Sequence, residues 1–235
     1  MTEHTYKEFD QELESIRSGV LTMGGQVEQQ LARAIEVLAL DKGDEFIDQV
    51  GTTETLINAA QVGIDQQCMQ IIARRQPTAV DLRMILNVTK IVNDLERIGD
   101  EAKKIAYKAA STYDNPRLTQ MRHYDVARAA VEARKLLQSA LDSFARLDAG
   151  AAADVVAHDD HIDASFHSIL RQLVSHMMED PRTITPALEI VFIAKSIERI
   201  GDHAKNIAEA VVQVVKGTDV RHASADQIRA EVVAE

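Results

Sequence analysis

The chain has 235 residues and a formal net charge of −11, which argues against a protein that binds nucleic acid, because phosphate-backbone binders carry clustered Lys and Arg. Its single cysteine, Cys68, excludes an intramolecular disulfide, and its position near an apolar helical stripe indicates a buried, inert thiol. The 10 glycines, 4 prolines and 4% aromatic residues are typical of long helices.

The sequence predicts neither a signal peptide nor a membrane-spanning helix. The N-terminal segment lacks the apolar stretch of a signal peptide, and no uncharged apolar run approaches the roughly 18 residues that a membrane-spanning helix needs. We therefore expect a cytoplasmic protein that reaches the inner membrane only through its partners.

Apolar residues recur at three- and four-residue steps along most of the chain, which predicts an all-α protein. The first stripe begins at Phe9, Leu13 and Ile16, and Gly24-Gly25 interrupts it at a point where a helix can bend. The predicted helices span about 7–40, 45–75, 79–112, 118–148, 152–178 and 183–216, and residues 218–235 form a frayed tail or a short helix.

Turn and breaker residues separate these helices. Asp41 to Asp44 forms a turn, Pro77 and Pro181 end the second and fifth helices, and Gly217 ends the sixth. The strongest break is Tyr113-Asp114-Asn115-Pro116. The sequence therefore predicts two tandem, pseudo-symmetric three-helix bundles over residues 1–114 and 115–217, followed by a tail over 218–235.

A polar motif supports this division. Leu95-Glu96-Arg97-Ile98-Gly99-Asp100 returns 102 positions later as Ile197-Glu198-Arg199-Ile200-Gly201-Asp202, a shift of nearly half the chain. On a helix, Glu96 and Asp100 project side by side at i and i+4, as do Glu198 and Asp202. The repeated unit thus carries a pair of carboxylates as well as an apolar stripe.

The repeated acidic pair is unfavourable for a helix on its own. Two like charges at this spacing cost roughly 0.2–0.5 kcal/mol, and a helical glycine costs roughly 1 kcal/mol relative to alanine. One interpretation is a solvated face on which Lys104 balances Asp100 and Lys205 balances Asp202. The other is a site for a hard cation, whose oxygen ligands these would be. Since the apolar stripe lies roughly opposite, we expect the carboxylates to face outward from the core.

Further ligands are expected from the neighbouring helices. Glu54 and Asp159 occupy equivalent places in the second and fifth predicted helices, and Asp163 lies one turn after Asp159. Asn58 stands where the second copy has Asp163, so the first cluster should be poorer in negative charge. The candidate metal ligands are Glu54, Glu96, Asp100, Asp159, Asp163, Glu198 and Asp202.

Other chemistry has weaker support. Four histidines surround the second copy, but each alone is more often a surface or core residue than a ligand: His158, His161, His167 and His203. A ferritin-like di-iron site needs Glu-x-x-His on two helices, and here glycine follows each glutamate at i+3. Arg74 and Arg75 could mark an anion site, although positive charge that complements a helix end explains them as well.

The chain resembles the PhoU family of phosphate-signalling regulators over about residues 7–222. The resemblance rests on the twin Glu-Arg-Ile-Gly-Asp segments and on four further stretches: Leu13 to Arg17, Met23 to Gly25, Ile72 to Arg83 and Met177 to Ile184. It implies two three-helix bundles in a self-associating protein, expected as a homodimer. It also implies that the acidic motifs named above bind divalent or trivalent metal ions, with Fe, Zn, Mn and Mg all open.

The resemblance further implies a function. Members act beside the high-affinity phosphate ABC transporter and a sensor histidine kinase, and they repress the phosphate-starvation response without enzymatic turnover. We therefore expect a non-enzymatic, metal-binding adaptor between the transporter ATPase subunit and the kinase that also modulates phosphate uptake. Two alternatives stay open: a metal-dependent hydrolase that uses a water on the clustered cations, and a purely structural helical scaffold.

Overall fold

The structure, a computed structural model, describes residues 7–39, 44–111 and 124–233. The first half supplies α1 (Lys7–Ala39), α2 (Asp44–Arg75) and α3 (Ala79–Ser111). The second half supplies α5 (Tyr124–Arg146), α6 (Ala149–Glu179), the short 3-10 helix η1 (Pro181–Thr183), α7 (Ile184–Lys216) and α8 (Ala225–Val233). These ranges contain no strand, so the all-α prediction is confirmed.

The predicted helix limits agree with the observed ones to within a few residues where both are described. Gln76 follows α2 with a positive φ of 50°, so the helix ends before Pro77. Gly217 ends α7 with a φ of 88° and donates its N–H to the carbonyl of Gln213. The tail forms a short helix, α8. The predicted turn at 41–43 and the predicted break at 113–116 lie outside the described residues.

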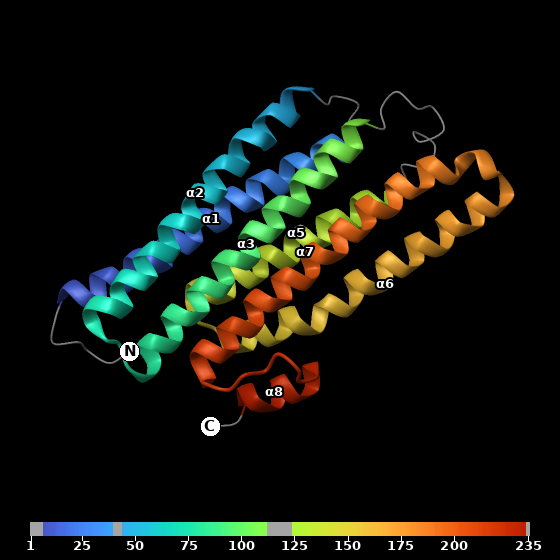
Figure 1. Cartoon of the computed structure of the whole chain (residues 1–235). Coiled ribbons are helices and arrows are strands. Elements are labelled where there is room, and N and C mark those ends of the chain that lie inside the picture. Colours follow the sequence, from blue (N-terminus) through green and yellow to red (C-terminus); the bar gives the residue numbers. More distant parts are fainter. Residues whose placement is uncertain (1–6, 40–43, 112–123, 234–235) are drawn as a thin grey trace.

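The two halves are three-helix bundles that lie side by side (Figure 1). Within each half the three helices contact one another, α1 with α2 and α3, and α5 with α6 and α7. Between the halves α3 packs on α7 and α1 packs on α5, so these four helices form the centre. The helices α2 and α6 flank this centre, each covering only helices of its own half.

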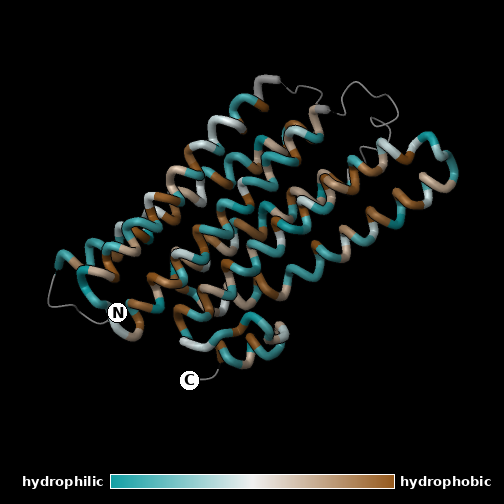
Figure 2. The backbone as a smooth tube through the Cα atoms, in the orientation of Figure 1, coloured by the Kyte–Doolittle hydropathy of each residue, from teal (hydrophilic) through white to brown (hydrophobic). Residues whose placement is uncertain are grey.

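Each long helix is amphipathic, and Figure 2 shows apolar and polar residues interleaved along every one of them. Their apolar stripes join in one continuous core to which both halves contribute, from Ile16 and Leu31 in α1 to Leu137 and Phe144 in α5. Cys68 is fully buried in this core, as predicted, and burial raises the pKa of its thiol to about 11. None of the described helices has an apolar stretch long enough to cross a bilayer.

Polar contacts connect α3 to α7, which run antiparallel. Arg199 donates from a guanidinium nitrogen to Glu101 Oε1 at 3.2 Å, and Lys108 Nζ donates to Glu189 Oε2 at 2.7 Å. His203 Nδ1 lies 2.8 Å from Asp94 Oδ1. These polar contacts add specific links between the halves to the apolar core that the halves share.

Gly24 lets α5 approach α1 closely. The helix α1 continues through Gly24 and Gly25, which are the pair at which the sequence allows a bend. A Cβ at Gly24 would lie 2.6 Å from Leu141 Cδ2 of α5, whereas a Cβ at the exposed Gly25 would meet nothing within 4 Å. Gly24 therefore permits the close contact between α1 of the first half and α5 of the second.

Because only Gly24 is closely packed, alanine substitutions at Gly24 and Gly25 form a matched pair of variants. We expect Gly24→Ala to be less stable than Gly25→Ala by about 1–3 kcal/mol, because only the first methyl group overpacks the core. Both substitutions share the helix-propensity gain of about 1 kcal/mol, which therefore cancels in the comparison. Urea unfolding followed by far-ultraviolet circular dichroism measures the difference. Equal midpoints would show that Leu141 turns aside at no cost.

Candidate functional site

The first acidic cluster lies between α2 and α3. Glu54 comes from α2 and is buried, while Glu96 and Asp100 come from successive turns of α3. The Glu96 side chain is only 18% exposed. Burial raises the pKa of Glu96, and the charges of Asp100 and Glu54 raise it further. The three carboxylates thus share one poorly solvated region, whereas Asn58 is exposed.

Few donors satisfy this first cluster. Gln30 of α1 donates its amide to Glu54 Oε2 at 3.0 Å, and Lys103 Nζ lies 3.8 Å from Glu54 Oε1. Arg97 Nε lies 3.6 Å from Glu96 Oε2, beyond hydrogen-bond distance. That buried Glu96 oxygen accepts no hydrogen bond. A carboxylate oxygen left in this state costs free energy that a bound cation would recover.

The second acidic cluster lies between α6 and α7. Asp159 and Asp163 come from α6, and Glu198 and Asp202 come from α7. Asp159 is 1% exposed and burial raises its pKa, although an ion pair with Lys205 opposes this effect. Burial and the charges of Glu198, Asp159 and Asp163 raise the pKa of Asp202. The charges of the other three predicted residues therefore all act on Asp202.

Two lysines enter this second cluster. Lys205 Nζ donates to Asp159 Oδ2 at 3.0 Å, while Asp159 Oδ1 is buried and accepts no hydrogen bond. Lys195 Nζ lies 2.5 Å from both Glu198 oxygens. Two ammonium groups thus face four carboxylates, and the cluster keeps a negative charge.

The expected outward orientation of the acids is wrong for the two glutamates. Glu96 is 18% and Glu198 13% exposed, because α2 and α6 cover the side of α3 and α7 that lies opposite the apolar stripe. The expected lysine pairing is also wrong. Lys104 binds Glu101 at 2.9 Å and not Asp100. Lys205 donates its hydrogen bond to Asp159, and the charge of Asp202 acts on it only as a neighbour, helping to raise the pKa of Lys205.

The recurring glycines have a structural explanation. A Cβ at Gly99 would lie 3.0 Å from Gln30 Oε1, and a Cβ at Gly201 would lie 3.0 Å from Asp159 Oδ1. Either distance is tighter than an ordinary contact. Glycine in the turn between the paired acids therefore lets a buried polar side chain of a neighbouring helix reach α3 or α7.

The residues present fit a hard cation. In the described part of the chain no three His, Cys, Asp or Glu side chains converge closely enough to hold a metal ion as they stand. Even so, each cluster contains buried carboxylate oxygens without a hydrogen bond: Glu96 Oε2 in the first, and Asp159 Oδ1 and Glu198 Oε2 in the second. Carboxylate oxygens are the ligands that hard cations prefer. Cation binding would require these side chains to close on one another.

Sequence reasoning missed several buried polar residues, of which Glu101 and Gln30 lie beside the site. Glu101 is buried, and its pKa lies below the usual value because hydrogen bonds from Lys104, Ser196 and Arg199 outweigh the effect of burial. Gln30 is fully buried in α1 and donates to Glu54. A polar residue inside an otherwise apolar stripe was the available signal for Gln30. Nothing in the sequence distinguishes Glu101 from a surface acid.

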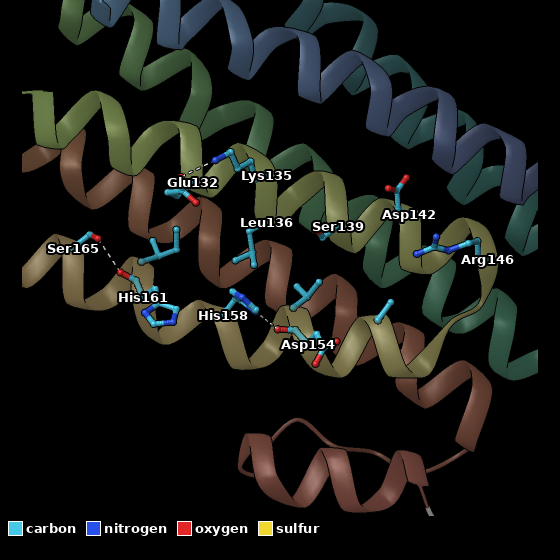
Figure 3. A pocket seen from close by; sticks show the side chains of 13 residues that line it. Glu132, Lys135, Leu136, Ser139, Asp142, Arg146, Asp154, His158, His161 and Ser165 are labelled. Atoms are coloured by element: carbon cyan, nitrogen blue, oxygen red, sulfur yellow. Dashed lines mark hydrogen bonds and ion pairs between the residues drawn. The ribbon is translucent and has the colours of Figure 1, made fainter.

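The histidines are not hydrogen-bonded to the predicted ligands in the described residues, although the charge of His203 acts on Glu96. His158 and His161 line a groove of about 550 Å³ between α5 and α6, where Figure 3 places them opposite Glu132 and Lys135. His203 contacts Asp94 instead. Of the two arginines considered for an anion site, Arg75 donates to Glu12 of α1 at 2.9 Å. Its guanidinium group therefore links α2 to α1 through an ion pair.

Comparisons with known proteins agree with this architecture. The family model described as PhoU domain matches residues 20–109 and again 126–211. The phosphate-specific transport system accessory protein PhoU homolog of Pseudomonas aeruginosa is 43% identical over 232 residues, which cover 99% of this chain and 95% of that protein. The phosphate-specific transport system accessory protein PhoU of Escherichia coli K12 is 40% identical over 97% of this chain and 93% of its own length.

Solved structures are similar as well. The crystal structure of PhoU from Pseudomonas aeruginosa superimposes with a TM-score of 0.85, covering 89% of this chain and 100% of that chain at 43% identity. The phosphate transport system regulatory protein PhoU from Streptococcus pneumoniae gives a TM-score of 0.78 at 25% identity, over 90% and 99% of the two chains. The shared fold and the near full-length similarity lead to one conclusion: this chain belongs to the PhoU family.

Proposed function

We propose that this protein is a non-enzymatic accessory protein of phosphate-specific transport that represses the phosphate-starvation response when phosphate is abundant. The observation that carries the proposal is similarity over nearly the whole chain to proteins named as phosphate transport accessory proteins. Similarity of this extent includes both halves of the chain.

In this proposal the protein works as a cytoplasmic adaptor. Its partners are the ATPase subunit of the phosphate ABC transporter and a sensor histidine kinase, and it meets the membrane only through them. It also pairs with a second copy of itself. The rigid, continuous core supports an adaptor role, because helices packed along their length hold two binding faces in fixed relation.

Cations at the two acidic clusters are the second part of the proposal. Glu54, Glu96 and Asp100 would hold one, and Asp159, Asp163, Glu198 and Asp202 would hold the other. A bound Fe, Zn, Mn or Mg ion supplies positive charge that offsets the repulsion among these carboxylates. The buried oxygens that lack hydrogen bonds support this assignment.

Gene deletion tests the regulatory role. We expect the deletion strain to express alkaline phosphatase in high phosphate at a level close to that of starved wild-type cells, because repression needs the adaptor. The parent strain should stay repressed, and a plasmid copy of the gene should restore repression. Unchanged repression in the deletion strain would remove the regulatory proposal.

Elemental analysis tests cation binding. Protein purified without chelator should contain metal, and the variant Glu96→Gln, Asp100→Asn, Glu198→Gln, Asp202→Asn should lose most of it, because carboxylates bind hard cations far better than amides. Added metal at about 100 times its Kd should stabilise the native protein by about 2.7 kcal/mol in urea unfolding.

The controls for this variant are its fold and one distant acid. Far-ultraviolet circular dichroism should match that of the wild type, and Glu132→Gln, an exposed acid of the α5 groove, should keep full metal content. Equal metal content in the fourfold variant and the wild type would refute binding at the repeated acidic pairs.

A further inference from the structure

Each acidic cluster contains a lysine at the same place in the repeat. Lys103 follows Asp100 by three residues in α3, and Lys205 follows Asp202 by three residues in α7. Both lysines reach across to the acid of the flanking helix, Lys103 to Glu54 at 3.8 Å and Lys205 to Asp159 at 3.0 Å. The duplication has therefore kept a cation-to-acid contact as well as the acids.

The lysine contact uses oxygens that a metal ion would need. Lys205 Nζ is bonded to one oxygen of Asp159, and the other oxygen is buried without a hydrogen bond. Asp159 is almost fully buried, so water does not replace the ammonium group easily. A cation coordinated by Asp159 together with Asp202 would bring its positive charge against the Lys205 ammonium group, and like charges at this distance repel strongly in a poorly solvated region.

We propose that Lys205 and Lys103 act as built-in counterions that stabilise the acidic clusters without metal, and that cation binding expels each ammonium group from Asp159 or Glu54. This rests on the cation binding proposed above and goes beyond it, because it makes cation binding an exchange. The exchange moves the lysine side chain away from the contact between α3 and α2, or between α7 and α6. Whether a cation is bound at the acidic clusters thereby changes the charge that α3 and α7 present to a partner.

The two clusters differ in how tightly the lysine is held. In the first, Glu54 also accepts a hydrogen bond from Gln30, and the lysine lies at 3.8 Å. In the second, Asp159 depends on Lys205 alone at 3.0 Å, and Lys195 binds Glu198 nearby. The second cluster therefore shows the exchange more clearly, and Lys205 is the residue to test.

Acetylation of lysines by a small reagent at fixed pH, quantified at each residue by mass spectrometry, tests the exchange in the full-length protein. The probes are Mn²⁺ and Zn²⁺, each added alone to chelator-treated protein. We expect saturating metal to raise acetylation of Lys205 roughly two- to tenfold, the factor that corresponds to breaking one hydrogen-bonded ion pair. Lys104, which binds Glu101 outside both clusters, is the matched control and should not change.

The second measurement is the affinity for the same two ions by equilibrium dialysis. Lys205→Met should bind metal about tenfold more tightly than the wild type, because a competing charged hydrogen bond is gone. Lys104→Met removes the same charge one residue later in the first repeat, outside both clusters, and its affinity should change less than about twofold. A general loss of positive charge would affect both variants alike.

The outcomes separate the exchange from cation binding itself. The exchange is overturned if metal binds the wild type while Lys205 acetylation stays constant, or if Lys205→Met binds no more tightly than Lys104→Met. In either case the proposed cation site stands. If neither ion binds the wild type or Lys205→Met, the cation site and the exchange both fail.

Discussion

Packing of α3 against α7 is the constraint on which the rest of the structure depends. Each of these helices contacts both other long helices of its own half as well as the opposite half. The side facing the other half carries Glu101, Asp94 and their partners Arg199 and His203. The side facing α2 or α6 carries the repeated acidic pair. A helix with three covered sides leaves only a narrow strip for solvent, which explains why Glu96 and Glu198 are poorly hydrated while Asp202 is exposed.

Burying these acids costs free energy, and the structure recovers only part of it. Burial disfavours the charged form of Glu96, Asp159 and Asp202, whose pKa values are all raised. Lysines and one glutamine contact some of the oxygens, yet Glu96 Oε2 and Asp159 Oδ1 stay without a hydrogen bond. A fold maintained only for stability has no need of such groups, because apolar residues of similar size would pack as well or better. The cost therefore favours a functional reason for the clusters.

Much of this architecture could be predicted because helix periodicity and breaker residues are local signals. Pro77 and Gly217 end helices through their own backbone chemistry, and the stripes from Ile16 to Phe144 report burial directly. The orientation of Glu96 and Glu198 could not be predicted in this way. A helical wheel shows what lies opposite the core-facing stripe, but not which neighbouring helix covers it. The partners of Lys205 and Glu101 are likewise set by tertiary packing between residues far apart in the chain.

The two clusters reach related electrostatic states by different means. In the first, Lys103 and Arg97 face three carboxylates, and the Gln30 amide supports Glu54. In the second, Lys195 and Lys205 face four carboxylates with no amide on Asp159. The summed formal charge of these side chains is negative in both clusters and more negative in the second. A bound cation is therefore stabilised more strongly in the second cluster. The two halves therefore share unbalanced carboxylate charge beside α3 and α7 and differ in the side chains that partly offset it.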